Sequence, residues 1–442
     1  MKKILTILLF SFILVFLLHN LLYFPPRGSY DPGSHYRYAN TLLKQKRFPI
    51  RDESVHFHNP PLWYLIGSAS IAFTENILKL TDWRLTIKPW QMTNLLFSFF
   101  SLVLWYKISR FVFKKQAYPS IFFILFLFSL PVFLRISAMM SIEPVLTFIS
   151  SLLIFLLFKF TRNKLTIKHL IIFGTILGLA MITKITSYAF VVTLGLIIFI
   201  TVWLKDKRDL MTSIFAGLVV AGLILALSGW FYIYKAKAYG LLTSGKIYSI
   251  RTQPKSFYTD YPIRIMLSYP VRPWIGNKFF PVMYVDFWGD YWNYFSQRRY
   301  GVDIEFLRTK NREKVSETRR LDLARQTQVN LFTTAIIVLG FIITSLRRIK
   351  SIFKNKFNHQ SIQSLTLLTF FWVSFLGYFY FQSRAPSWDG SNIKPSHLIY
   401  IWPVPILFTV EYLYSIKNKF IRLSIILLLF FPIGLNLWFS WF

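Results

Sequence analysis

Cysteine is absent from this chain of 442 residues. Its absence excludes disulfide bonds, metal sites with thiolate ligands and catalysis by a thiol nucleophile. Acidic residues are also scarce, because 18 Asp and Glu residues stand against 51 Lys and Arg residues and give a formal charge of +33. Any chemistry that needs a carboxylate must therefore come from a small set of residues, so each acid outside the apolar segments is a candidate.

Apolar residues dominate the composition. The chain is 54% hydrophobic and 19% aromatic, with 47 Phe residues, which is more than a soluble core of this length could bury. The composition therefore predicts an integral membrane protein. In such a protein the excess positive charge first suggests cytoplasmic loops and contacts with anionic lipid headgroups, and nucleic-acid binding is not expected.

Apolar runs long enough to cross about 30 Å of hydrocarbon predict an all-α polytopic protein with about eleven transmembrane helices. The first run follows Met1-Lys2-Lys3, is too long for a signal peptide and lacks a small-residue cleavage site, so we expect a retained span. The predicted spans are 4–24, 92–113, 117–134, 142–159, 167–183, 186–204, 213–235, 330–346, 364–381, 397–414 and 420–440.

Basic residues mark alternate connections between these runs. If the N-terminus is cytoplasmic, every cytoplasmic connection carries several cations, whereas the short outer turns carry few. The positive-inside rule therefore predicts a multi-pass protein of the cell (plasma) membrane, with the N-terminus cytoplasmic and the C-terminus outside.

Two predicted outer segments, 25–90 and 236–329, are too long to be simple turns. They divide the chain into an N-terminal catalytic transmembrane module (1–235, with the loop 25–90), a large outer loop (236–329) and C-terminal transmembrane helices (330–442). We expect interfacial helices in both loops. In the first loop, Asp31-Pro32 is a typical helix start, and the apolar run 62–73 is too short to span.

The first loop also holds the sharpest candidates for chemistry. Asp31 could act as a general base at the membrane surface, or could serve only as a helix N-cap. His35 follows four residues later, on the same helical face, and could orient Asp31. His56 and His58 alternate around Phe57, so an extended segment would present both on one side, either for a metal or, for His58, for a phosphate group.

Further candidates map to the predicted outer ends of other spans. Glu143 opens the fourth span, where an acid facing the bundle interior is a functional hypothesis. Lys184 interrupts two adjacent spans and could hold a lipid phosphate or extend to the interface. The other cations of the outer turns could complete a ring around an anionic group: Arg135, Arg384, Lys394 and His397.

Several short motifs resemble the C-type glycosyltransferases, the polytopic enzymes that include the protein O-mannosyltransferase and aminoarabinose transferase families. The resemblance covers about the first 200 residues well and later ones thinly. Its motifs are 31–39, His58-Asn59-Pro60-Pro61-Leu62, Ser141-Ile142-Glu143-Pro144, 178–184 and 395–403.

The resemblance implies transfer of a sugar, hexose or pentose, from a polyprenyl-phosphate donor to a hydroxyl acceptor on a glycan, lipid or protein. It implies Asp31 as the catalytic base, Glu143 as a second acid, and phosphate contacts from Lys184 and His58. No cofactor is required, and a divalent metal is compatible but not predicted. The chain departs from many relatives, which carry a second acid beside the first, Lys near His58, and Arg near His397.

Two other functions are compatible with the sequence. A transporter or flippase of an anionic lipid-linked substrate would predict internal repeats and broken or charged spans near the bilayer midplane. A polymerase-like or ligase-like enzyme would use the 236–329 loop, and then Asp286, Asp290 and Arg298 would matter more than Asp31.

Overall fold

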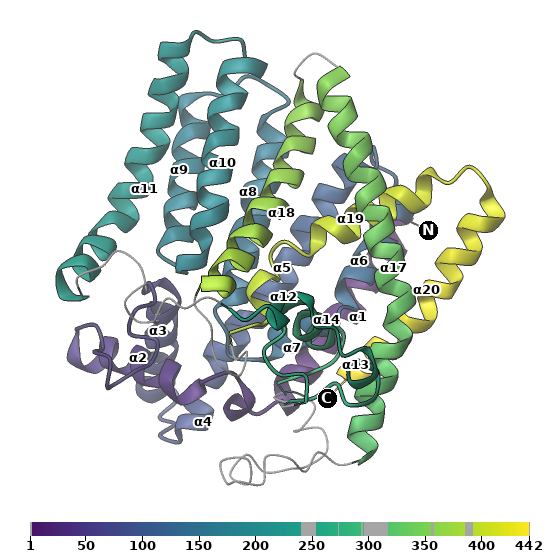
Figure 1. Cartoon of the computed structure of the whole chain (residues 1–442). Coiled ribbons are helices and arrows are strands. Elements are labelled where there is room, and N and C mark those ends of the chain that lie inside the picture. Colours follow the sequence, from purple (N-terminus) through teal and green to yellow (C-terminus); the bar gives the residue numbers. More distant parts are fainter. Residues whose placement is uncertain are drawn as a thin grey trace.

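The computed structural model describes residues 2–239, 253–272, 274–292, 295, 317–354, 358–384 and 392–441. Within these ranges the regular secondary structure is entirely helical, which confirms the all-α prediction (Figure 1). The helices of eight residues or more are α1 (Lys2–Tyr23), α2 (Pro32–Gln45), α3 (Leu62–Asn76), α5 (Lys88–Val112), α6 (Ala117–Phe128), α7 (Pro131–Ala138), α8 (Glu143–Phe160), α9 (Ile167–Met181), α10 (Tyr188–Ile200), α11 (Leu210–Tyr239), α14 (Phe279–Trp288), α17 (Glu317–Lys354), α18 (His359–Arg384), α19 (Pro403–Ser415) and α20 (Lys419–Ser440).

Eight helical segments in the described ranges are long and apolar enough to cross a membrane, and a ninth is counted if the bent pair α6 and α7 forms one span. α6 and α7 differ in direction by 66°. Pro131 begins α7 and has no N–H group for a continuous helix, so the chain breaks at this point. The membrane prediction is therefore supported.

Two predicted spans are shorter in the structure than in the sequence pattern. α9 has 15 residues and α19 has 13. At about 1.5 Å per residue, neither helix alone reaches the roughly 30 Å of a hydrocarbon core. In the second case the apolar run includes a separate 3-10 turn, η5 (Pro395–Leu398), before α19 starts.

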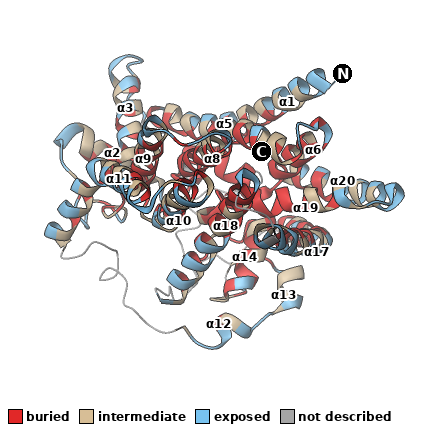
Figure 2. Ribbon diagram, turned by 90° about the horizontal axis from the view of Figure 1, so that it is seen from above, coloured by how far each residue is buried: buried red, intermediate tan, exposed pale blue. Residues whose placement is uncertain are grey.

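The bundle has a buried centre and a more exposed periphery (Figure 2), and many of the exposed side chains are large and hydrophobic. Only 17% of the most apolar window of α11 and 22% of that of α20 is buried in the protein. α11 packs on α9 very closely, because a Cβ atom on Gly178 would lie 2.9 Å from the side chain of Leu227. This contact leaves the other faces of α11 available to lipid.

The loop 25–90 forms α2, α3 and the short α4 (Trp83–Thr86), which gather at one end of the bundle (Figure 1). α2 and α3 have 14 and 15 residues, and their starts agree with the predicted interfacial helices. α3 lies against α5 where Gly67 faces Trp90, and a Cβ atom there would approach the indole ring to 2.4 Å. Because Gly67 has no side chain, α3 can lie this close to α5 and to the rest of the bundle.

The described parts of the loop 236–329 also lie at this end (Figure 1). They form α12 (Ser256–Thr259), α13 (Ile263–Ser268) and α14, and the start of α17. Of the charged stretch 298–325, residues 317–325 are helical, whereas Arg298 lies outside the described residues.

Candidate active site

Asp31 occupies the N-cap position of α2, but its side chain does not cap the helix. Its backbone is left-handed, with φ 47° and ψ 44°, and no capping hydrogen bond forms. An N-cap residue normally has extended backbone, which directs its side chain to the free N–H groups. The carboxylate of Asp31 is instead 54% exposed, so it is accessible to a reactant.

His56 is the nearest partner of this carboxylate, with 3.8 Å between Nε2 and Oδ2. Burial lowers the pKa of His56 to about 4, so the ring is neutral near pH 7. The side-chain amide of Asn59 is 3.4 Å from His56 Nδ1 and can donate to it. Under that arrangement the ring proton sits on Nε2, on the side of Asp31.

His35 lies behind His56 and not beside Asp31. The two imidazole rings stack with centroids 3.9 Å apart, and His35 Nδ1 is 3.1 Å from the Tyr64 hydroxyl. Burial lowers the pKa of His35 well below its usual value. The ring of His35 therefore contacts His56 and Tyr64, and the contact with Asp31 is the backbone hydrogen bond from His35 N–H to the Asp31 carbonyl oxygen.

A second group of charged residues forms around Glu143. Its Oε1 lies 2.6 Å from Lys184 Nζ and 2.7 Å from His397 Nδ1, and its Oε2 accepts a hydrogen bond from Ser141. The side chains of Glu143 and Lys184 are 7% and 9% exposed. The structure thus joins three sequence candidates, separated by up to 254 positions, in one buried cluster.

Two hydrogen bonds link this cluster to the first loop, and a third links it to α5. The amide nitrogen of Met140 donates to Ser29 Oγ over 2.7 Å, and that of Leu62 donates to the carbonyl oxygen of Ile182 over 3.1 Å. Asn94 of α5 donates to the carbonyl oxygen of Ser141. The segments that carry Asp31, Glu143 and Lys184 are therefore fixed relative to one another.

Lys394 is a further cation of this region. Its Nζ lies 4.2 Å from the centroid of the Tyr30 ring and 6.0 Å from that of Trp292, and no acid of the described chain lies within ion-pair distance of it. Burial lowers the pKa of Lys394, whereas the charges of Asp31 and Glu143 act in the opposite direction. The sequence offered only its place in an outer turn as a signal.

Two predicted site residues lie apart from these groups. The segment with His56 and His58 folds into turns and is not the extended segment that would present both rings on one side. Burial and then the charge of Lys235 on α11 lower the pKa of His58 to about 3. Arg384 ends α18 and contacts the ring of Tyr380 at 5.8 Å. Residues 385–391, which follow it, are outside the described ranges.

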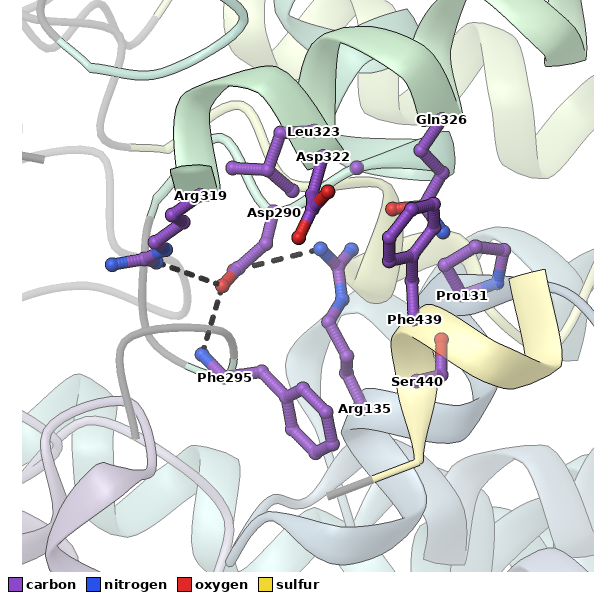
Figure 3. Close-up of a pocket in the computed structure, with 11 residues that line it drawn as sticks. Pro131, Arg135, Asp290, Phe295, Arg319, Asp322, Leu323, Gln326, Phe439 and Ser440 are labelled. Atoms are coloured by element: carbon purple, nitrogen blue, oxygen red, sulfur yellow. Dashed lines mark hydrogen bonds and ion pairs between the residues drawn. The ribbon is translucent and has the colours of Figure 1, made fainter. Parts of the chain in front are cut away.

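A separate acidic cluster joins α7, α14 and α17 (Figure 3). Arg135 Nη1 and Arg319 Nη2 lie 3.5 and 3.7 Å from the two carboxylate oxygens of Asp290, which is 3% exposed. Arg135 also donates to the backbone carbonyl of Asp286, and burial raises the pKa of Asp286 to about 6. Arg135 is thus engaged by acids and is not a free cation.

The cavity beside Asp290 has a volume of about 20 Å³, which on the same measure is room for about one or two water molecules. Figure 3 shows Arg135 and Arg319 directed at the carboxylate from opposite sides. This cluster therefore resembles a structural connection between helices more than a substrate site. Within the described ranges, no group of three or more His, Asp and Glu residues has the arrangement of a metal site.

Comparisons with known proteins identify the fold. No family model and no curated protein matches the chain. Two solved structures of ArnT from Cupriavidus metallidurans are similar, one in the apo state (TM-score 0.51, 12% identity) and one bound to undecaprenyl phosphate (TM-score 0.50, 11% identity). Each match covers 93% of this chain and 60% of the ArnT chain.

At this level of identity the similarity shows a shared fold. The chain has the polytopic helical architecture of ArnT and spans about 60% of the length of that protein. The predicted resemblance to C-type glycosyltransferases is thereby supported at the level of the fold.

Proposed function

We propose that this protein is a membrane glycosyltransferase that moves a sugar from a polyprenyl-phosphate donor to a hydroxyl acceptor, with Asp31 as the general base. The fold shared with ArnT, an aminoarabinose transferase, supports the class of enzyme. One ArnT structure contains undecaprenyl phosphate, which supports the class of donor.

The observation that carries the proposal is the state of Asp31. Its carboxylate is exposed, makes no capping bond and lies beside a neutral histidine. The acids of the other two clusters, Glu143 and Asp290, are buried and held by cations. A general base must reach the proton of an incoming alcohol, and of these acids Asp31 alone is open to one.

In the proposed step the acceptor oxygen attacks the anomeric carbon of the donor sugar. The bond between that carbon and the phosphate oxygen breaks, and its electron pair stays on the departing polyprenyl phosphate. The acceptor proton moves to Asp31. Proton removal by a positioned carboxylate contributes typically about 10² to 10⁴ to the rate.

The departing phosphate gains negative charge and needs a cation. Lys184 is held at 2.6 Å by Glu143, so part of its charge is already balanced. Lys394 lies over the ring of Tyr30, which precedes Asp31 in the chain, and it forms no ion pair with an acid in the part of the chain that the structure describes. We therefore assign the main contact with the leaving phosphate to Lys394, with Lys184 in support.

Glu143 then has a positioning role. Its carboxylate orients both Lys184 and His397 through one oxygen, and it is 6% exposed, which leaves little room for an acceptor. This role replaces direct proton transfer by Glu143 in the proposal.

The test compares purified wild type and Asp31→Asn in lipid, with radiolabelled polyprenyl-phosphate hexoses and pentoses. Asp52→Asn is the matched control, because Asp52 is an exposed acid of the same loop. We expect Asp31→Asn to slow transfer by about 10² or more, and Asp52→Asn to transfer at the wild-type rate.

Lys394→Met should lower kcat by about 10² to 10³, the cost of removing one group that stabilises a developing anion. Transfer at the wild-type rate by Asp31→Asn, or no transfer from any of the donors, would contradict the proposal.

A further inference from the structure

His56 lies beside the proposed base, and the proposed reaction does not yet use it. Its imidazole ring stacks face to face on that of His35, with centroids 3.9 Å apart and planes 4° from parallel. At the edge of the ring, the side-chain nitrogen of Asn59 lies 3.4 Å from Nδ1. The ring is therefore held by its face and by one of its two nitrogen atoms.

The groups that hold this ring are themselves fixed. The Tyr38 hydroxyl donates to the carbonyl oxygen of Asn59 over 2.9 Å, and the Asn59 side chain donates to the Tyr64 hydroxyl over 3.2 Å. That hydroxyl lies 3.1 Å from His35 Nδ1, and the rings of Tyr38 and Tyr64 stack with centroids 3.7 Å apart. Buried side chains joined in such a network restrict one another, so the position of the His56 ring is set before a substrate binds.

The backbone that carries His56 is tied to the start of α2. Ser54 Oγ donates to the carbonyl oxygen of Ser34 over 3.0 Å, and the N–H group of Val55 donates to Ser34 Oγ over 2.9 Å. The N–H group of His56 in turn donates to Ser54 Oγ over 3.1 Å. Ser34 lies in the first turn of α2, just after Asp31, so these bonds fix the separation of the segments that carry Asp31 and His56.

One polar atom of His56 is left without a hydrogen bond. Its Nε2 is covered and has no hydrogen-bond partner in the described part of the chain, and Asp31 Oδ2 lies 3.8 Å away. Burial lowers the pKa of the ring to about 4, so near pH 7 it is neutral and carries one proton. Donation to Nδ1 by Asn59 leaves that proton on Nε2. A covered N–H group without an acceptor costs about 1 to 3 kcal/mol, which points to a bond that forms in the working enzyme.

The backbone of Asp31 favours the same contact. Its left-handed conformation, with φ 47° and ψ 44°, costs a residue with a side chain about 1 to 2 kcal/mol, although Asp tolerates it better than most. Extended backbone would allow the carboxylate to cap α2, whereas the observed conformation gives up this cap and leaves the carboxylate beside His56. Local strain of this kind at a candidate site supports a functional role for the arrangement.

We propose that His56 positions the base of the proposed reaction: its Nε2–H group donates to one carboxylate oxygen of Asp31 and leaves the other oxygen to take the proton of the acceptor hydroxyl. The inference rests on the proposed function. In this step the acceptor proton ends on Asp31, and His56 keeps its own proton.

The contact must shorten for this role. The separation of 3.8 Å is longer than a hydrogen bond, and the hydrogen bonds of catalytic groups often tighten only when a substrate is bound. The His56 ring is held on several sides, whereas the side chain of Asp31 is 54% exposed. Rotation of the Asp31 side chain therefore closes the gap.

The first test separates the N–H group of His56 from its ring, with purified protein in lipid and radiolabelled polyprenyl-phosphate sugars. His56→Phe keeps a flat ring against His35 but has no donor, and it should lower kcat about tenfold to a hundredfold with KM within about twofold, because a misplaced base slows the step without weakening binding. His56→Gln keeps an N–H donor but loses the stacked ring, so it should retain more of the wild-type kcat and unfold at a lower temperature.

The order of the two variants decides between a positioning and a packing role. A wild-type kcat in His56→Phe, or a kcat of His56→Gln below that of His56→Phe, would mean that the ring serves only the fold and would overturn the proposal.

The second test determines whether His56 acts through Asp31. In the Asp31→Asn protein the base is already lost, so adding His56→Phe should change the remaining kcat by at most about twofold. Reductions in kcat that multiply would mean that the two side chains act independently, and they too would overturn the proposal.

The third test needs no substrate. In protein labelled with ¹⁵N in its seven histidines, NMR of the wild type should show His56 protonated on Nε2, and Asp31→Asn should shift the Nε2 signal because the neighbouring charge is removed. The signal of His56 is identified by its loss in His56→Gln. A proton on Nδ1, or an Nε2 signal that Asp31→Asn leaves unchanged, overturns the proposal.

These outcomes separate the role of His56 from the proposed function. Slow transfer by Asp31→Asn beside wild-type transfer by His56→Phe rejects the positioning role alone. Wild-type transfer by Asp31→Asn, or no transfer from any donor, rejects the proposed function and the positioning role with it, while the NMR measurement still reports the contact between the two side chains.

Discussion

The ion pair of Glu143 and Lys184 offers a stability test that needs no knowledge of the substrate. Glu143→Gln removes the carboxylate that lies 2.6 Å from Lys184 and 2.7 Å from His397. The glutamine side chain has a similar shape, so the main loss is charge. Lys184 would remain buried, with His397 Nδ1 3.2 Å away as its described neighbour.

The magnitude follows from burial and distance. At an effective dielectric constant of about 20, two unit charges 2.6 Å apart attract by about 6 kcal/mol. Desolvation of both ions offsets much of this attraction, and loss of one partner of a buried pair costs about 3 to 5 kcal/mol. With an unfolding entropy of about 2.1 cal/mol/K per residue over 442 residues, this loss lowers Tm by about 3 to 5 °C.

The assay is thermal unfolding in detergent of four proteins: wild type, Glu143→Gln, Lys184→Met and the double variant. Each single variant should unfold at a lower temperature. The double variant should lose less than the sum of the two, because neither charge is then left unpaired. Glu75→Gln is the control, since the pair of Glu75 and Lys44 lies at the surface, with side chains 27% and 54% exposed, and should contribute at most about 1 kcal/mol.

Two outcomes would refute this reasoning. The first is a Tm of Glu143→Gln equal to that of wild type. The second is an additive double variant, which would mean that the two side chains do not interact in the folded protein.

Three further predictions concern acid stability, the Asp290 cluster and helix packing. Burial lowers the pKa values of His56 and His58 to about 4 and about 3, from about 6.5 in the unfolded chain, so the unfolded state binds more protons between these values. Tm should therefore fall as the pH drops from about 6.5 to about 3. A Tm that does not change with pH over this range would contradict the burial of both rings. Asp290→Asn should lower Tm by several degrees, because two arginines lose their acid partner, and should leave the transfer rate per folded molecule unchanged. Loss of transfer at an unchanged Tm would favour the polymerase-like or ligase-like alternative. Gly178→Leu should destabilise the contact between α9 and α11 by about 1 to 3 kcal/mol. The measurement is Tm, and Gly195→Leu is the control, because its added Cβ atom meets nothing within 4 Å. Equal changes in Tm for the two variants would contradict the close packing at Gly178.

The sequence predicted the helices well because apolar length and proline position are local properties. The run 213–235 corresponds to α11, and α2 and α3 start at Asp31-Pro32 and just after Pro60-Pro61 as expected. The hydrophobic pattern overestimated the lengths of the helices in 167–183 and 397–414, because an apolar run gives no signal where the backbone changes direction.

The candidate residues were predicted in part. Asp31, Glu143, Lys184 and His397 stood out because charged residues are rare next to apolar runs. His56 was considered only as a metal ligand beside His58, and the turn that separates the two rings gave no sequence signal. Lys394 was included only as one of several outer-turn cations around an anionic group, because its place in a turn does not show which aromatic rings and charges surround it.

The sequence by itself determined that the chain is an all-helical membrane protein with a few acids and cations at the ends of its helices. The reason is that the length of an apolar run and the position of each charge are local properties of the sequence. Only the tertiary structure decided which of those charges neutralise one another. Glu143 and Asp290 are held by cations, whereas Asp31 is exposed and Lys394 forms no ion pair with an acid of the described residues. The physical reason is that burial and ion pairing depend on side chains far apart in the chain, and these determine whether a charge is available for a substrate.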